Sequence, residues 1–151
     1  MIRMTRLTDY GILLLTRFAA DGAKGLHSAR GLAGETHLPL PTVSKVLKAL
    51  AKHGLLEAHR GVKGGFTLSR RPADISVAEI IDAFEGPIGV TDCTSVDTPC
   101  CDVERTCGTR DHWKRINRVV IDALRGVTLA DMARPAAPAG VPVEFRVKAK
   151  V

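Results

Sequence analysis

The chain has 151 residues, of which 45% are hydrophobic and 25% are charged, and its formal net charge is +6. This length allows one domain with an added oligomerisation element, but not two independent cores. The longest aliphatic run, residues 12–15, is too short to span a bilayer, and the N-terminus lacks the apolar stretch of a secretory signal. We therefore expect a cytoplasmic protein with reduced thiols and no membrane partner.

The positive charge is concentrated in the first half of the chain. Residues 1–71 hold 12 Lys and Arg against 4 Asp and Glu, a balance of +8, whereas residues 72–151 hold 10 against 12, a balance of −2. A basic segment of this kind favours a polyanionic partner such as nucleic acid. The alternative is that these charges only keep a small domain in solution.

Two helices are predicted near the N-terminus. Apolar residues recur at helical spacing over residues 8–20, and Asp21-Gly22 ends that run. Ser28 suits the N-cap of a short second helix. The first of these helices is expected to be buried.

A third helix follows a proline pair. Pro39 and Pro41 are expected to keep Leu38 and Leu40 out of helical geometry, so the chain must turn there. Pro41 suits the first position of a helix. The apolar residues of that helix fall on one face: Val43, Val46, Leu47 and Leu50. The order helix, turn, helix results.

The next segments complete a winged helix. Residues 55–59 and 66–69 are predicted strands, joined by the glycine-rich loop 60–65 into a hairpin that would form the wing. Residues 76–79 read as a capping box that opens a further helix, which Gly86-Pro87 closes.

A long amphipathic helix is predicted over residues 110–127. Its apolar residues repeat at spacings of three and four: Trp113, Ile116, Val120, Ala123 and Val127. This pattern favours a two-helix dimer interface, while a helix folded back on its own core is the alternative. Residues 134–151, rich in Pro and Ala at first, are expected to form a flexible tail, although alternation over residues 143–151 would permit a strand.

The residues predicted to contact DNA lie on the third helix and the wing. Residues near the N-terminus of a recognition helix reach base edges, so base readout is expected at Thr42 and Lys45, whereas Lys48 is better placed for phosphate. Basic side chains at the tip of a wing can enter the minor groove. The complete predicted set is Ser28, Pro41, Thr42, Ser44, Lys45, Lys48, Arg60, Gly61 and Lys63.

Four cysteines, Cys93, Cys100, Cys101 and Cys107, lie within fifteen residues. In a reducing compartment they are compatible with structural zinc, a thiol switch or an iron-sulfur cluster. No Cys-x-x-Cys pair is present, which disfavours zinc. Adjacent Cys100 and Cys101 point apart, so only one of them is expected to be a ligand.

Several motifs together resemble the winged-helix iron-sulfur regulator family that includes IscR, NsrR and RirA. The similarity covers residues 1 to about 133 and rests on segments 6–10, 60–68 and 75–81 and three spaced cysteines. Segments 91–93, 107–110, 113–117 and 128–132 are most similar to the branch that regulates the SUF cluster-assembly operon.

This resemblance implies a homodimer in which each cluster is held by three cysteines of one subunit and a fourth ligand. Cys93, Cys101 and Cys107 match the three positions, with Cys100 as an alternate. The fourth ligand of IscR is a histidine three residues after the last cysteine, where this chain has Arg110, which cannot bind a metal. Asp9 from the partner subunit matches the ligand of NsrR, and His112 is a nearby substitute. Asp9 could instead only cap or charge-pair at the first helix.

The sequence therefore predicts a mainly α protein: a winged helix-turn-helix with a small β-hairpin wing and a long C-terminal dimerisation helix. The expected boundaries are 1–86 for the DNA-binding domain, 87–109 for the cysteine loop, 110–133 for the dimerisation helix and its end, and 134–151 for the tail. The expected function is a non-enzymatic repressor of SUF-type genes that binds an operator according to the state of an iron-sulfur cluster, with 2Fe-2S favoured and 4Fe-4S possible. Alternatives are a regulator sensing thiol oxidation or nitric oxide, and a small iron-sulfur redox protein.

Overall fold

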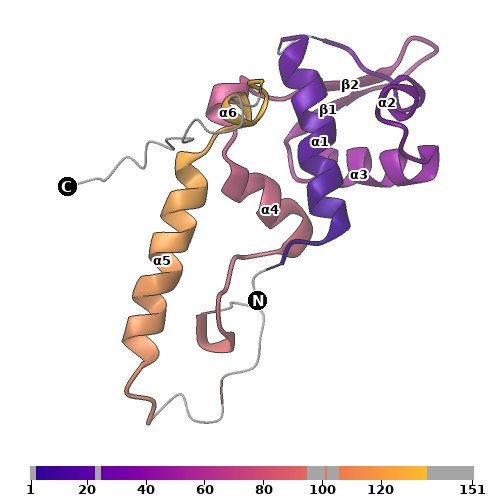
Figure 1. Ribbon diagram of the computed structural model, residues 1–151. Helices are drawn as coiled ribbons and strands as arrows, with labels where there is room; N and C mark the ends of the chain where they lie inside the picture. Colours follow the sequence, from indigo (N-terminus) through magenta and orange to yellow (C-terminus); the bar gives the residue numbers. More distant parts are fainter. Residues whose placement is uncertain (1–2, 23–24, 95–100, 102–105, 136–151) are drawn as a thin grey trace.

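The computed structural model describes residues 3–22, 25–94, 101 and 106–135. The predicted flexible tail, the optional strand at 143–151 and Cys100 fall outside these residues, apart from Arg134 and Pro135 at the start of the tail. In chain order the elements are α1 (Arg6–Ala20), α2 (Ala29–Thr36), α3 (Leu40–Lys52), β1 (Leu56–His59), β2 (Gly65–Leu68), η1 (Pro72–Asp74), α4 (Val77–Glu85), η2 (Asp92–Thr94), α5 (Arg110–Gly126) and α6 (Leu129–Met132). The predicted mainly α winged helix is confirmed (Figure 1). Within the described ranges, every helix is too short or too polar to cross a membrane.

The core forms where the apolar faces of α1, α3 and α4 meet beneath the hairpin. Its fully buried side chains include Leu14, Leu15, Phe18, Leu32, Val43, Val46, Leu47, Leu50, Ile75 and Ile80. Gly11 lets α4 approach α1 closely, because a Cβ at this position would collide with the ring of Phe84. The three- and four-residue spacing seen in the sequence is thus used to build one continuous core.

The helix-turn-helix differs from the predicted one at its turn. Ser28 caps α2 as predicted, since its Oγ accepts a hydrogen bond from the Gly31 amide at 3.0 Å. His37 ends α2 in the left-handed region with φ 57°. The prediction that Leu40 stays out of helical geometry is wrong, because α3 begins at Leu40 and Pro41 occupies its second position. A proline is tolerated there because the first helical amides have no partner within the helix.

The wing is an antiparallel hairpin. Leu56 pairs with Leu68 at its base, and His59 pairs with Gly65 at its tip. Gly61 has φ +116°, and a Cβ on Gly64 would meet the backbone of residues 59–61, so the tight loop requires glycine at both positions. The amide and carbonyl of His27 bond to Phe66, which attaches the hairpin to the segment before α2.

The C-terminal part leaves the core and then returns to it. Ser76 and Glu79 form the predicted capping box of α4. The long helix α5 stands beside α4 and extends away from the winged helix (Figure 1). A second capping box, Thr128 with Asp131, opens the short α6, and Leu129 is completely buried. The chain after α5 is therefore part of the core that holds the helix-turn-helix and the hairpin.

A carboxylate joins the start of α1 to the end of α4. Glu85 accepts hydrogen bonds from the Thr5 amide at 2.8 Å and from the hydroxyl of Thr8, which is fully buried. Burial raises the pKa of Glu85, but the hydrogen bonds from Thr8 and Thr5 lower it by more, so its pKa lies below the ordinary 4.5. The ionised form is the one that holds α1 to α4.

This depressed pKa predicts a loss of stability in acid. The Glu85 carboxylate contributes fully above its unfolded-state pKa, and the contribution disappears as the pH falls through the lower folded-state pKa. In urea denaturation between about pH 6 and pH 3, the wild type should lose unfolding free energy more steeply than Glu85→Gln. Parallel pH profiles for the two proteins would contradict this linkage.

Candidate functional site

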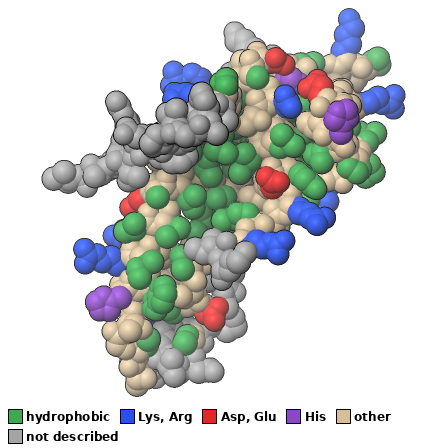
Figure 2. Space-filling view, in the orientation of Figure 1, with side chains coloured by type: hydrophobic (Ala, Val, Ile, Leu, Met, Phe, Trp, Pro, Cys, Tyr) green, Lys and Arg blue, Asp and Glu red, His purple; other side chains and the backbone are tan. Residues whose placement is uncertain are grey.

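One end of the molecule carries an exposed basic surface. Lys45 and Lys48 are exposed on α3, opposite the buried face formed by Val43, Val46, Leu47 and Leu50, while Thr42 and Ser44 are half-buried. Figure 2 shows Lys and Arg side chains projecting from the end that holds α2, α3 and the hairpin. A helix presented in this way has the dimensions and charge to enter a major groove.

The remaining predicted DNA contacts lie at the starts of α2 and α3 and at the tip of the wing. Ser28 and Pro41 are exposed at the starts of α2 and α3, and Arg60, Gly61 and Lys63 are exposed at the tip of the wing. The fold therefore keeps every predicted DNA-contact residue out of the core, on α3, at the start of α2 or on the wing.

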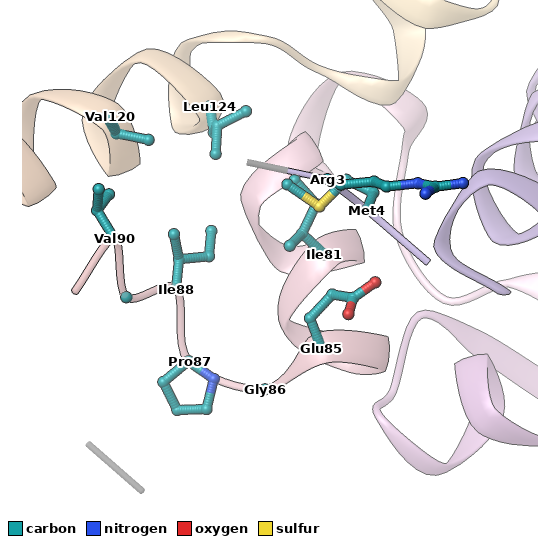
Figure 3. Close-up of a pocket in the computed structure, with 11 residues that line it drawn as sticks. Arg3, Met4, Ile81, Glu85, Gly86, Pro87, Ile88, Val90, Val120 and Leu124 are labelled. Atoms are coloured by element: carbon teal, nitrogen blue, oxygen red, sulfur yellow. The ribbon is translucent and has the colours of Figure 1, made fainter. Parts of the chain in front are cut away.

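The long helix α5 has an exposed apolar side. Trp113, Ile116 and Val119 are 37%, 44% and 64% exposed. Val120 and Leu124 instead face α4 and, with Ile81, Ile88 and Val90, line a cavity of about 630 Å³ (Figure 3). The predicted apolar stripe is thus divided, because Val120 turns toward the molecule's own body while Trp113 and Ile116 remain uncovered.

Cys93 lies on η2, half-buried against the middle of α5. Its Sγ is 3.3 Å from the Thr91 hydroxyl. The hollow beside it, about 340 Å³, is lined on the α5 side by Lys114, Arg118 and Arg125. Asp122 lines the same hollow, so Cys93 lies beside both basic and acidic side chains of α5.

Cys107 lies two residues before the N-cap of α5. Its Sγ is 3.3 Å from the Thr109 hydroxyl. Hydrogen bonds from the Thr109 side chain and amide and from the Arg110 amide, together with the Arg110 charge, lower the pKa of Cys107 below its ordinary value, although desolvation opposes them. A thiolate is the form of cysteine that both ligates metals and attacks disulfides.

The candidate ligands lie on different segments of the chain. Cys93, Cys101 and Cys107 are free thiols, all half-buried. Asp9 is exposed in the first turn of α1, and His112 is exposed in the first turn of α5. In the described part of the chain, no three His, Cys, Asp or Glu side chains converge on a point that could hold a metal ion.

The donor set nevertheless fits an iron-sulfur cluster in kind. Soft thiolates are the ligands that iron-sulfur centres use, and Cys107 is held in an environment that favours the thiolate. Binding would require residues between Cys93 and Cys107 to bring the sulfur atoms together.

No role was predicted from the sequence for Asn117, which lies beside Cys93. Asn117 is a buried polar side chain on α5, and it bonds to the backbone of Ile88 and Val90. The signal in the sequence was a polar residue four positions after Trp113 and three before Val120, within the apolar face. A polar group there needs bonding partners to offset its burial.

Comparison with known proteins identifies relatives over most of the chain. It is 27% identical over 135 residues to the protein rrf2 of Nitratidesulfovibrio vulgaris, covering 89% of each chain. Its fold matches CymR, the global cysteine regulator of B. subtilis, with a TM-score of 0.68 and 26% identity, covering 88% of this chain and 97% of that one. It also matches T. potens IscR, with a TM-score of 0.63 and 26% identity over 87% and 85% of the two chains.

The family model Rrf2, described as an iron-dependent transcriptional regulator, matches residues 4–135. This range includes the winged helix, all four cysteines and the whole of α5 and α6. The resemblance inferred from the sequence motifs is therefore confirmed at the level of the family. The chain belongs to the Rrf2 family and is a DNA-binding transcription regulator rather than an enzyme.

Proposed function

We propose that the protein is a homodimeric repressor whose affinity for its operator depends on an iron-sulfur cluster, and that its targets are SUF-type cluster-assembly genes. The observation that carries the proposal is the position of the cysteines. Cys93 packs against the middle of α5 and Cys107 precedes its first turn, and α5 continues through α6 into the core of the DNA-binding domain. A change at the cysteines can thus reach the winged helix through one rigid element.

The ligands we propose are Cys93, Cys101 and Cys107, with Asp9 of the partner subunit as the fourth. Cys100 and His112 are the alternates. A 2Fe-2S cluster bound there would supply iron–thiolate bonds that link Cys93 to Cys107, and a 4Fe-4S cluster would supply the same link.

Neighbouring side chains would support the sulfur atoms in this role. Thr91 offers its hydroxyl group to the Cys93 sulfur, and Thr109 offers its hydroxyl group to the Cys107 sulfur. Lys114 and Arg118 line the hollow beside Cys93, where they would offset the negative charge of a thiolate bound to iron. Groups of this kind around a metal site orient its ligands and tune their charge.

Dimerisation is supported by the uncovered side of α5. Trp113, Ile116 and Val119 are exposed apolar residues of α5, a helix whose other side lies against α4 and η2 (Figure 1). Apolar rows on exposed helices are typically covered by a second helix. A pair of α5 helices would place two recognition helices on one duplex, as a palindromic operator requires.

The proposal is tested by comparing cluster-loaded and cluster-free protein on the same DNA. The protein is purified anaerobically and reconstituted with ferrous iron and sulfide, and its iron, sulfide and visible absorption are measured. An operator is selected from random duplexes and compared with the promoters of SUF genes. We expect the two forms to differ in Kd by about tenfold or more at fixed salt. Identical occupancy by both forms would overturn cluster-dependent control.

The basic surface leads to a prediction about base readout. Lys45→Ala should weaken operator binding by about 1–3 kcal/mol and should affect random DNA less, because the side chain is exposed in the N-terminal half of α3, the part from which base edges would be reached. Lys52→Ala is the matched control, since Lys52 is exposed at the other end of the same helix. Fluorescence anisotropy on both duplexes measures the difference. Equal losses of affinity for operator and random DNA would mean that Lys45 contacts phosphate and does not read bases.

A second candidate function is favoured by the lowered pKa of Cys107. A thiolate reacts readily with disulfides and peroxides, so the same fold could respond to thiol oxidation without a metal. In that case, metal-free protein treated with an oxidant and then with a reductant should lose and regain operator binding. A colourless preparation without iron after reconstitution, together with this reversible response, would favour the second function.

A further inference from the structure

Asn117 is the only buried polar side chain among the described residues of α5. It is 8% exposed, while the residues on either side of it, Ile116 and Arg118, are exposed. An apolar residue would ordinarily fill such a position, because burying an amide costs free energy unless each of its polar atoms is bonded. The burial of Asn117 is therefore explained only if both polar atoms of its amide have bonding partners.

Both ends of the amide bond to one extended segment of backbone. The Asn117 Nδ2 donates to the Ile88 carbonyl at 3.2 Å, and its Oδ1 accepts from the Val90 amide at 3.0 Å. Rotating the amide by half a turn would place a donor against the Val90 amide and an acceptor against the Ile88 carbonyl, so the bonding pattern defines its orientation. One side chain thus holds residues 88–90 in a fixed register on α5.

The segment held in this way leads directly to Cys93. Thr91 follows Val90, and its amide donates to the Thr94 Oγ1 at 3.0 Å while the Thr94 hydroxyl donates to the Thr91 carbonyl at 2.8 Å. This closed turn carries Cys93, whose Sγ lies 3.3 Å from the Thr91 hydroxyl. The bonds of Asn117 to residues 88–90, the backbone from Val90 to Thr91 and the bonds of Thr91 therefore connect α5 to the Cys93 sulfur.

The other end of α5 is attached equally firmly to the DNA-binding domain. The Val127 carbonyl accepts from the Val77 amide at 2.9 Å, and the Leu129 amide donates to the Ile75 carbonyl at 2.8 Å. A displacement of α5 would therefore also displace the start of α4, which packs on α1 and α3.

We propose that Asn117 is the positioning residue that ties Cys93 to α5, so that ligand binding at Cys93 changes the placement of the dimer helix. This inference rests on the proposed function, because it assigns a route of regulation to the same cysteine site. Asn117 makes its hydrogen bonds to the backbone of Ile88 and Val90, and it acts through that backbone. Without it, Cys93 could still bind, but its ligation would no longer be transmitted to α5.

The test compares the wild type with Asn117→Ala, Asn117→Asp and the control Arg115→Ala, which changes an exposed residue of the same helix. Asn117→Ala removes both bonds, whereas Asn117→Asp keeps the acceptor for the Val90 amide and loses the donor to the Ile88 carbonyl. Each full-length protein is reconstituted anaerobically with ferrous iron and sulfide. The half-life of its visible absorption is then followed in excess EDTA.

We expect Asn117→Ala to shorten that half-life by about tenfold, Asn117→Asp to give an intermediate value and Arg115→Ala to match the wild type. In metal-free protein, iodoacetamide should label Cys93 faster in Asn117→Ala, with Cys107 as the internal reference in peptide mass spectrometry. The ratio of operator Kd values for cluster-free and cluster-loaded protein should fall toward one, while cluster-free binding stays unchanged.

Three outcomes would overturn the inference in different ways. If the wild type itself retains no iron and sulfide, the proposed function fails and the inference fails with it. If the wild type retains its cluster and Asn117→Ala behaves like Arg115→Ala, only the inference fails. If both Asn117 variants unfold, or weaken cluster-free and cluster-loaded DNA binding equally, Asn117 is a structural residue and not a link between Cys93 and α5.

Discussion

Leu129→Ala is expected to lower the free energy of unfolding by about 2–5 kcal/mol. Leu129 is 0% exposed and is part of the core formed by α1, α3 and α4. Its truncation leaves a cavity at the point where the chain re-enters the DNA-binding domain after α5. Urea denaturation at fixed protein concentration measures the loss, since the stability of a dimer depends on its concentration.

Met132→Ala is the matched control for this change. Met132 lies on the same short helix and is 40% exposed, so its truncation should alter the unfolding free energy by about 0.5 kcal/mol or less. Equal losses for the two variants would mean that α6 does not dock through Leu129. In that case the attachment of α5 to the winged helix would depend on the backbone bond between Val127 and Val77 and on the packing of α5 against α4.

The elements that could be predicted are those with a long periodic pattern. Residues 43–50 repeat their apolar positions at three and four, and they form the buried face of α3. The capping box at Ser76 and Glu79 is local, and it marks the start of α4 as expected. Such elements are specified by contacts within a few residues, and the sequence displays those contacts directly.

The turn before α3 shows where local rules fail. Leu40 precedes a proline, a position that disfavours helix, yet it is the first residue of α3. His37 takes the left-handed conformation that glycine more often provides, so no glycine marks the end of α2. The packing of α3 against the core outweighs these small local preferences.

Long-range bonds had no signal of their own in the sequence. The partners of Asn117 are backbone groups 27 and 29 residues earlier in the chain. Backbone groups are the same at every residue, so no pattern of side chains could have named Ile88 and Val90. Similarly, α6 has four residues, which is too few to show a helical period. The burial of Leu129 became evident only with the fold.

Of the site, the sequence indicated the residue types but not their arrangement. The cysteines, the basic recognition helix and the wing could all be named in advance. The separation of Cys93, on η2, from Cys107, before α5, depends on how α5 packs against residues 88–94. The hydroxyl groups of Thr91 and Thr109 were likewise found only through their distances to the sulfur atoms.

Cys107→Ser is expected to abolish retention of the proposed cluster. A serine hydroxyl keeps the shape of the side chain but is a hard, protonated group, and it is a much poorer ligand for cluster iron than the soft thiolate it replaces. Cys107 is also the cysteine for which the neighbouring groups, first of all the Thr109 hydroxyl, favour the thiolate by lowering its pKa. Iron and sulfide per subunit should therefore fall to the background level after anaerobic reconstitution, and operator binding should become independent of iron and sulfide.

The adjacent pair Cys100 and Cys101 provides the comparison. Under the proposed ligand set, Cys101→Ser should lose the cluster as Cys107→Ser does, while Cys100→Ser should keep both its iron content and its cluster-dependent DNA binding. The reverse result would move the ligand to Cys100 and leave the regulatory proposal intact. If Cys107→Ser instead retains full iron and sulfide, Cys107 is not a ligand of the cluster. The lowered pKa of Cys107 would then support the thiol-oxidation function.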